Sequence, residues 1–193
     1  MDVFTDFPDS AERVLEFHRA HGGLTRDLKV RRILELLGNE SPSESEVFDR
    51  VSHFTELVVE RVVQAPEMPG TGTFLREWSH RCPLHAVSAT PDEELQRIMA
   101  ARGLLSFFRR VRGWPPEKSA LISQEIASGG VDPSQCILVG DSGEDYQAAK
   151  RASVRFIFFG APTTGGQQPS VPRITSWSAF DEAAAEVLDQ TVS

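Results

Sequence analysis

Two acids stand four residues apart just after a short apolar run that ends in Gly140. Asp141 follows the run directly, and Asp145 lies one helical turn further on. Ligands of open α/β sheets bind at the carboxyl ends of strands, and Mg²⁺ prefers oxygen ligands such as carboxylates. The spacing therefore predicts a metal site in which Asp141 is a ligand and Asp145 binds the same ion or orients its waters. The alternative is that Ser142 caps a helix whose third residue is Asp145.

Three more residues are candidates for binding a phosphoryl group. Ser88 ends another predicted strand, where a hydroxyl and backbone N–H groups can bind anionic oxygens. Thr90 follows it, but with Glu93 it also matches a capping box, which favours a structural role. Lys118 lies in the first turn of a predicted helix, where a cation costs about 0.3–1 kcal/mol. A phosphate or carboxylate facing Lys118 would explain that charge, and a solvated lysine is the alternative.

The spacing of apolar residues separates a helical first third from a second part in which strands and helices alternate. The first third contains three predicted helices: around 14–18, over 24–37, and from 42 to about 63 with Ser41 as N-cap. The second part contains helices over 74–80, 90–102, 116–128, 144–151 and 179–188, and strands over 84–87, 110–113, 135–139 and 154–159. Such alternation predicts a doubly wound parallel sheet.

Composition narrows the classes of protein to consider. The 193 residues suit one domain, or one domain with a modest insert. The formal net charge is −8, and the densest basic stretch is only 109–112, so we expect no nucleic-acid partner. No apolar run approaches the ~18 residues of a membrane span, and no signal-peptide pattern is present. Cys82 and Cys136 are expected to be buried, reduced thiols, and the protein to be soluble and cytoplasmic.

Taken in this order, Ser88, Lys118 and the Asp141/Asp145 pair resemble the second, third and fourth motifs of the haloacid dehalogenase (HAD) superfamily of phosphatases. The segment 16–26 is similar to a cap segment of the phosphoglycolate-phosphatase-like and β-phosphoglucomutase-like members. The resemblance covers nearly the whole chain.

The resemblance implies a fold and a division of the chain. We expect a HAD-like α/β fold, with a doubly wound, Rossmann-like parallel sheet. Residues 1–66 would form an N-terminal helical cap, and residues 67–193 would form the core, without the first strand of the family.

The resemblance also implies a role for each candidate residue. In the family, an aspartate of an Asp-x-Asp pair attacks phosphorus, its partner acts as general acid and base, and Mg²⁺ neutralises the transferring group. By analogy, Ser88 and Thr90 would contact the phosphoryl group, and Lys118 would hold the charges of nucleophile and phosphate together. Asp141 would bind Mg²⁺ with support from Asp145. Arg26 would contact the substrate from the cap.

The chain departs from the family in one respect, because no Asp-x-Asp occurs in it. The nearest acids, Asp6 and Asp9, have the wrong spacing and enclose Pro8, which cannot donate in a buried strand. The family's first strand lies between the strands that end at Ser88 and Asp141. Without it, two interior strands should lack a shared neighbour, and the metal site should lack two ligands.

Three hypotheses for function remain open. The chain is the remainder of an active Mg²⁺-dependent phosphatase of small phosphorylated metabolites, such as phosphoglycolate or sugar phosphates, and is inactive as given. Alternatively, it is a degenerate relative that binds a phosphorylated ligand or a protein partner without turnover. In the third hypothesis it is an active enzyme that uses Asp6 or Asp9 as nucleophile. The motifs do not decide among phosphatase, mutase, phosphonatase and dehalogenase chemistry, nor do they name the substrate.

Overall fold

A computed structural model describes residues 4, 11–20, 26–161 and 170–189 of the chain. The chain divides into two compact units, residues 1–64 and 65–193. The boundary predicted from the sequence lies two residues later, after residue 66.

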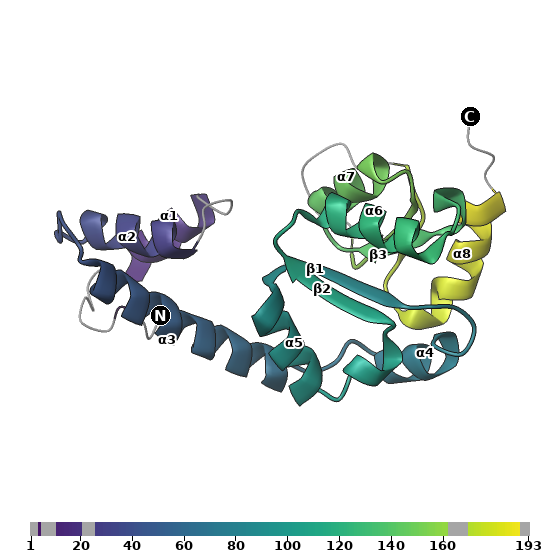
Figure 1. Cartoon of the computed structure of the whole chain (residues 1–193), viewed down its shortest axis with the longest axis horizontal. Helices are drawn as coiled ribbons and strands as arrows, with labels where there is room; N and C mark the ends of the chain where they lie inside the picture. The colour runs from purple at the N-terminus through teal and green to yellow at the C-terminus, as the bar shows by residue number, and fades with distance from the viewer. Residues whose placement is uncertain (1–3, 5–10, 21–25, 162–169, 190–193) are drawn as a thin grey trace. The chain divides into compact units, whose positions relative to one another are not determined.

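The N-terminal unit consists of helices packed on one small core. Its described helices are α1 (Ala11–Ala20), α2 (Arg26–Leu36) and α3 (Glu44–Gln64) (Figure 1). The core contains Val30 and Leu34 of α2 and Val47 of α3. The prediction that Ser41 caps the third helix is wrong, because the hydroxyl of Ser43 accepts the N–H of Glu46 (3.1 Å). These two residues have the same capping-box spacing two positions later.

The C-terminal unit has the predicted α/β architecture. Its helices are α4 (Thr71–Trp78), α5 (Asp92–Ala101), α6 (Lys118–Gly129), α7 (Gly143–Arg151) and α8 (Phe180–Asp189). Its strands are β1 (His85–Pro91), β2 (Arg110–Trp114), β3 (Ile137–Gly140), β4 (Arg155–Phe159) and β5 (Arg173–Ile174). Three short 3₁₀ turns, Leu105–Phe107, Pro133–Gln135 and Trp177–Ala179, connect these elements. The parallel α/β fold with N-terminal helices is thereby confirmed. Strand β5 is only two residues long and is not predicted from the sequence.

The strands form two separate parallel sheets. In one, β1 pairs with β2, so that His85 lies beside Arg110. In the other the order is β3-β4-β5, and Ile137 lies beside Arg155. In the described part of the chain no strand pairs with both β1 and β3. These are the two strands that the sequence analysis expected to lack a shared neighbour.

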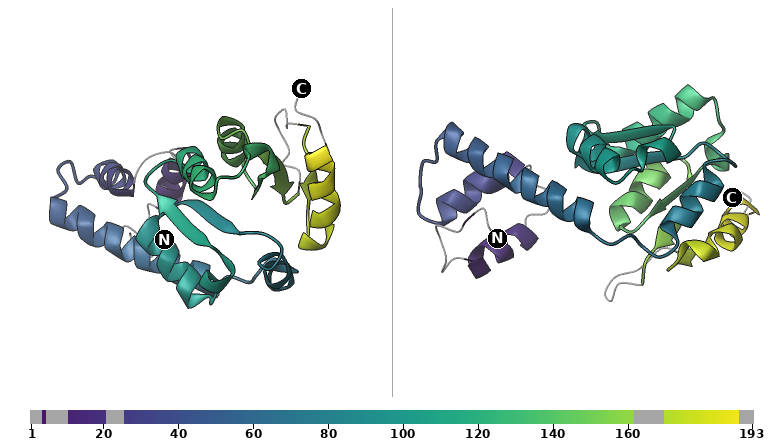
Figure 2. Two further views of the ribbon diagram at one scale, coloured as in Figure 1. Left: turned by 45° about the vertical axis from the view of Figure 1, so that its right-hand side comes forward. Right: turned by 90° about the horizontal axis from the view of Figure 1, so that it is seen from below.

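Helices cover both faces of the β3-β4-β5 sheet, and the helices on one of these faces also connect it to the β1-β2 sheet. Phe156 and Phe158 of β4 belong to a core cluster with residues of α6 and α7, whereas Ile157 belongs to a cluster with residues of α8. Alternate residues of a strand point to opposite faces, so α6 and α7 cover one face and α8 covers the other. Helix α6 packs on β1 and on α7, and α7 packs on β3 and β4 (Figures 1 and 2). The two sheets are therefore linked through α6 and α7.

A buried carboxylate fixes α6 on the first sheet. Glu125 of α6 is 7% exposed, and its Oε2 lies 3.0 Å from Nδ1 of His85 on β1. Nitrogens of Arg110 and Arg112 on β2 lie 3.6 Å from its two carboxylate oxygens. Removing one member of such a group leaves buried charge without compensation. This cluster is not predicted from the sequence, because its members lie far apart in the chain.

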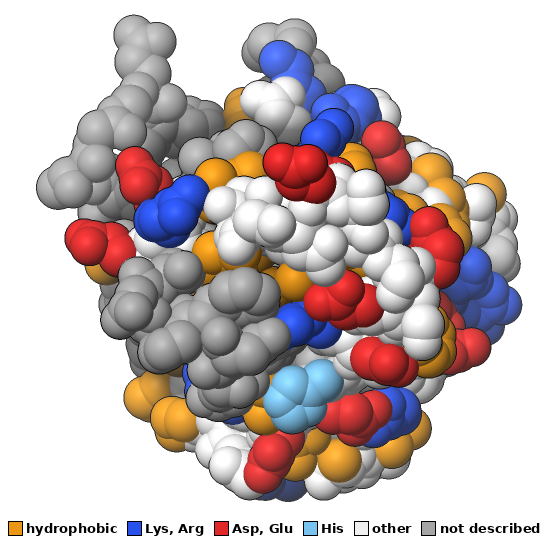
Figure 3. All heavy atoms as spheres, turned by 90° about the vertical axis from the view of Figure 1, so that its left-hand side faces the viewer, with side chains coloured by type: hydrophobic (Ala, Val, Ile, Leu, Met, Phe, Trp, Pro, Cys, Tyr) orange, Lys and Arg blue, Asp and Glu red, His pale blue; other side chains and the backbone are white. Residues whose placement is uncertain are grey.

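The distribution of surface charge and the character of the helices relate to two kinds of partner considered from the sequence, nucleic acids and membranes. Acidic and basic side chains are interspersed among the described residues of the face drawn in Figure 3. Within the described ranges, no helix has both the length and the apolar character required to span a membrane.

Both cysteines are free thiols, but Cys82 is exposed and Cys136 is half-buried. The prediction of two buried thiols is therefore wrong; Cys82 lies in the turn between α4 and β1, not in the strand.

Gly113 on β2 provides a test of the packing between β2 and the β1–α5 turn. A Cβ at this position would lie 2.5 Å from the Thr90 carbonyl oxygen and from Cα of Asp92, both of which are backbone atoms. We expect Gly113→Ala to lower the free energy of unfolding by roughly 1–3 kcal/mol, because the backbone must shift. The measurement is urea unfolding at pH 7.

The matched control is Gly143→Ala. A Cβ on Gly143 would meet no atom within 4 Å, so its free energy of unfolding should stay the same or rise by about 0.5–1 kcal/mol. Equal losses in the two variants would contradict the packing described for Gly113.

Candidate functional site

A cavity of about 310 Å³ lies between the two sheets, at the carboxyl end of β3. Val87 of β1 and Val139 of β3 contribute to its apolar lining, together with two aromatic side chains. Its polar wall is formed by Lys118, Asp141 and Asp145. The structure thus brings three of the predicted site residues to one cavity.

Asp145 is the most constrained member of the group. Its Oδ2 accepts the N–H of Asp141 (3.2 Å), the N–H of Ser142 (3.2 Å) and the hydroxyl of Ser142 (2.9 Å). In return, the N–H of Asp145 donates to the Ser142 hydroxyl (3.1 Å), which completes a capping box at the start of α7. The helix cap formed by Ser142 and Asp145, which the sequence suggested as the alternative to a metal site, is therefore present, and Asp145 makes further contacts besides it.

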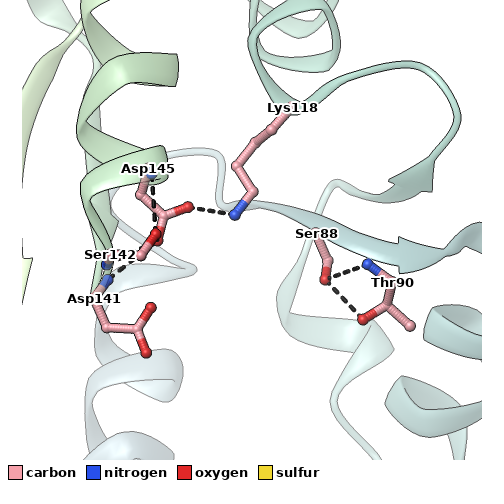
Figure 4. Close-up of polar contacts among 6 residues, drawn as sticks. All are labelled: Ser88, Thr90, Lys118, Asp141, Ser142 and Asp145. Atoms are coloured by element: carbon pink, nitrogen blue, oxygen red, sulfur yellow. Dashed lines mark hydrogen bonds and ion pairs between the residues drawn. The ribbon is translucent and has the colours of Figure 1, made fainter. Parts of the chain in front are cut away.

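Lys118 supplies the counter-charge to Asp145. Its side chain extends from the start of α6, and its ammonium pairs with Oδ1 of Asp145 (Figure 4). The lysine side chain is 26% exposed, whereas that of Asp145 is 7% exposed. Burial by itself raises the pKa of the Asp145 carboxyl. The hydrogen bonds from Lys118 and Ser142 and the charge of Lys118 outweigh burial and hold that pKa below its usual value.

Gly140 allows Asp145 to approach the end of β3. A Cβ on Gly140 would lie 2.5 Å from Cβ of Asp145 and 2.7 Å from its Cγ, closer than real contacts permit. The glycine before Asp141 is therefore a steric requirement of the site. From the sequence, this glycine is predicted only as the end of the apolar run.

Asp141 differs from Asp145 in being exposed. Among the described residues its carboxylate makes no hydrogen bond or ion pair, and Figure 4 shows it pointing away from Asp145. Within the same residues, no group of three or more His, Cys, Asp or Glu side chains is arranged to hold a metal ion. Mg²⁺ is often bound by one or two carboxylates plus phosphate and water. Asp141 fits such a ligand, whereas the oxygens of Asp145 already accept four hydrogen bonds. Direct ligation by Asp145 stays a prediction.

Ser88 and Thr90 bond to each other near the end of β1. The Ser88 hydroxyl donates to the Thr90 hydroxyl and accepts the Thr90 N–H, both at 3.0 Å (Figure 4). Strand β1 continues to Pro91, which is the N-cap residue of α5. The expected capping box of Thr90 with Glu93 is therefore wrong. Val87, rather than Ser88, lines the cavity, so the roles of Ser88 and Thr90 as phosphate contacts stay predictions.

Arg26 belongs to the N-terminal unit. Its guanidinium donates to the hydroxyl of Thr55 (3.0 Å) and lies over the ring of Phe54, 5.5 Å from the ring centroid. Its expected contact with substrate is untested. The candidate nucleophiles Asp6 and Asp9 lie outside the described residues.

Comparisons with known families and solved structures identify the family and the fold of the chain. Residues 23–159 match the family model described as haloacid dehalogenase-like hydrolase. No curated protein matches the chain.

Solved structures of related fold cover most of the chain. A haloacid dehalogenase-like family hydrolase from Streptococcus pneumoniae is 19% identical, covers 92% of this chain and 91% of its own, and has a TM-score of 0.59. A protein provisionally identified as a β-phosphoglucomutase from Thermotoga maritima is 19% identical, with 97% and 89% covered and a TM-score of 0.64. A predicted phosphoglycolate phosphatase from Haemophilus somnus 129pt is also 19% identical, with 81% and 76% covered and a TM-score of 0.63. Because each of these proteins is only 19% identical to the chain, the structural similarity establishes the fold alone.

The pairing of Asp145 with Lys118 makes a prediction about acid stability. Because the pKa of the folded-state carboxyl is lowered, its stabilising contribution is present above the unfolded-state value of about 3.9 and is lost as the pH falls through the folded-state pKa. We expect Asp145→Asn to lower the free energy of unfolding at pH 7 by about 1–3 kcal/mol. The gap between wild type and variant should shrink as the pH falls below about 3.9. Urea unfolding across this pH range measures both effects.

The control for this experiment is Glu144→Gln, which removes an exposed carboxylate from the neighbouring position. Its free energy of unfolding should stay within about 0.5 kcal/mol of wild type throughout. A loss in Asp145→Asn that is the same at pH 7 and pH 3 would show that the charge of Asp145 is not the cause.

Proposed function

The chain belongs to the haloacid dehalogenase-like hydrolases, and we propose that its site is that of a Mg²⁺-dependent phosphatase of small phosphorylated metabolites, such as phosphoglycolate or sugar phosphates. One observation carries the proposal. The Lys118–Asp145 pair and the exposed Asp141 share a cavity at the carboxyl end of β3. A fixed cation beside an available carboxylate suits a phosphate ester and its metal ion.

Each residue has a distinct task in this proposal. Lys118, held in place by Asp145, offsets the charge of the phosphate. Asp141 binds Mg²⁺, which neutralises the phosphoryl oxygens when bound. Ser88 follows the cavity-lining Val87, and in this proposal its hydroxyl exchanges its hydrogen bond to Thr90 for one to a phosphoryl oxygen. Arg26 contacts the substrate from the helical unit, and the protein acts on metabolites of the cytoplasm.

We further propose that the 193-residue chain by itself binds phosphate esters with turnover near background. Covalent phosphoryl transfer needs a nucleophile, and the chain contains no Asp-x-Asp. The same observation favours the second candidate function, a relative that binds a phosphorylated ligand without hydrolysing it. Detectable binding of phosphate esters would distinguish both of these candidate functions from a purely structural role.

Activity is tested with the purified chain, p-nitrophenyl phosphate and a panel of phosphorylated metabolites, with and without Mg²⁺. We expect hydrolysis to equal that of Asp141→Asn, which removes the proposed metal ligand. Robust Mg²⁺-dependent turnover that is lost in Asp141→Asn would contradict the expected inactivity. In that case Asp6→Asn and Asp9→Asn would show whether either acid is the nucleophile.

Binding is tested by the thermal stability of the chain with phosphoglycolate and Mg²⁺. A ligand present at 100 times its dissociation constant adds about 2.7 kcal/mol to stability, which raises the Tm. We expect this shift to disappear in Lys118→Ala and to persist in Lys150→Ala, which removes an exposed lysine of α7. Equal shifts in both variants, or no shift in wild type, would contradict a phosphate site at Lys118.

A further inference from the structure

We propose that a second cavity, at the amino ends of β1 and β2, binds a small organic carboxylate that carries an apolar body. This cavity has a volume of about 510 Å³, and all the residues that line it belong to the C-terminal unit. It is separate from the site at Lys118, which follows the opposite, carboxyl end of β2. The inference therefore does not depend on the proposed phosphatase function.

Two turns of the chain form the walls of this cavity. One turn connects α4 to β1 and ends at Leu84, and the other precedes β2 and ends at Arg109. The N–H of Arg109 donates to the carbonyl of Leu84 (2.8 Å), which holds the two turns together. Because this bond joins backbone atoms, the side chain of Arg109 can be replaced without removing it. Small-molecule sites commonly have volumes of about 300–1,000 Å³, and this cavity falls in that range.

The available polar side chains of the cavity include a guanidinium, an imidazole and a hydroxyl. Arg109, His80 and Ser106 are exposed, and among the described residues their side chains make no hydrogen bond or ion pair. No Asp or Glu belongs to the lining. A guanidinium presents a planar fork of N–H donors that matches the two oxygens of a carboxylate. Arg109 is therefore the anchor for an anionic ligand.

The surroundings of the cavity limit the charge of that ligand. Arg81 also lines the cavity, but its guanidinium already pairs with Glu77 and, at 3.5 Å, with Asp181. Ser79, the C-cap residue of α4, belongs to the lining as well, so the negative end of that helix dipole is close by. Only the charge of Arg109 is left to compensate a ligand. A carboxylate with one charge therefore fits better than a phosphate with two.

The apolar part of the lining accounts for the apolar body of the ligand. Phe107 and Phe108 are half-buried in one turn, and Pro83 and Leu84 lie in the other. An exposed ion pair by itself contributes little affinity, because water and salt screen it. Burial of an apolar group against these side chains supplies the remainder.

Cys82 lines the same cavity and serves as a reporter of its occupancy. The residue is exposed, but desolvation raises the pKa of its thiol, so little thiolate is present at neutral pH. The thiolate is the reactive form of cysteine, so these surroundings favour reversible binding over covalent capture of a ligand. A bound ligand should shield the sulfur from an added alkylating reagent.

The test follows alkylation of the purified full chain by N-ethylmaleimide at about pH 8 without Mg²⁺, with 3-phenylpropionate as the probe. Mass spectrometry of peptides reports Cys82 and Cys136 separately. We expect a Kd on the order of 0.1–1 mM for a probe of this size. At ten times that Kd, alkylation of Cys82 should slow about tenfold. Cys136 lies outside the cavity and should keep its rate.

Three related compounds test the chemistry of the ligand without any change to the protein. The neutral 3-phenylpropionamide lacks the charge, acetate lacks the apolar body, and phenyl phosphate carries a second charge. Each should protect Cys82 less than 3-phenylpropionate does at equal concentration. Equal protection by the amide or by acetate, or stronger protection by phenyl phosphate, would overturn the proposal.

Variants of the chain test the position of the ligand. Arg109→Gln should abolish the protection of Cys82, and Arg109→Lys should weaken it, because an ammonium keeps the charge but lacks the fork. Arg151→Gln is the matched control, since Arg151 is also exposed and lies on α7 outside the cavity. Protection should persist in this variant and in Lys118→Ala, so a failure of the proposed phosphate site would not affect the result. Absence of protection in wild type, its persistence in Arg109→Gln, or equal slowing of Cys136 would overturn the proposal.

Discussion

A strand inside a parallel sheet needs a hydrogen-bonding neighbour on each edge, and among the described residues β1 and β3 each have one. The rest of the C-terminal unit is arranged around this constraint. The two sheets are joined by the packing of α6 on α7 and by one apolar cluster that includes Val87 from the first sheet and Leu138 from the second. The ion pair of Lys118 with Asp145 runs from α6 to α7 and so crosses between the two halves.

The electrostatics of the site depend on the unequal environments of its two acids. Asp145 is buried and accepts hydrogen bonds from the backbone, from a hydroxyl and from an ammonium. Buried ion pairs contribute little net stability, because desolvation offsets their attraction, but they hold both partners in one geometry. The effect of Asp145 is therefore to fix the position of Lys118. Asp141, four residues earlier, remains exposed at the mouth of the cavity and is the acid that is available to a ligand.

Sequence reasoning predicted the α/β class, the parallel strands and the N-terminal helices, because local periodicity encodes them. It also brought Lys118, Asp141 and Asp145 to one edge, because the carboxyl ends of parallel strands meet there. The features that it missed depend on contacts between distant segments or on ambiguous local signals. Glu125 meets His85 and two arginines from other elements, which no spacing in the sequence reveals. Thr90 matched a capping box, yet its hydroxyl bonds to Ser88, because β1 continues beyond the predicted strand end.

Phosphoryl transfer, the reaction that we propose for this site, relies on electrostatic stabilisation together with a positioned nucleophile, and the proposed site supplies the first of these. The cation and the acids come from α6, from α7 and from the end of β3, which fold around a hydrophobic core that does not depend on the nucleophile.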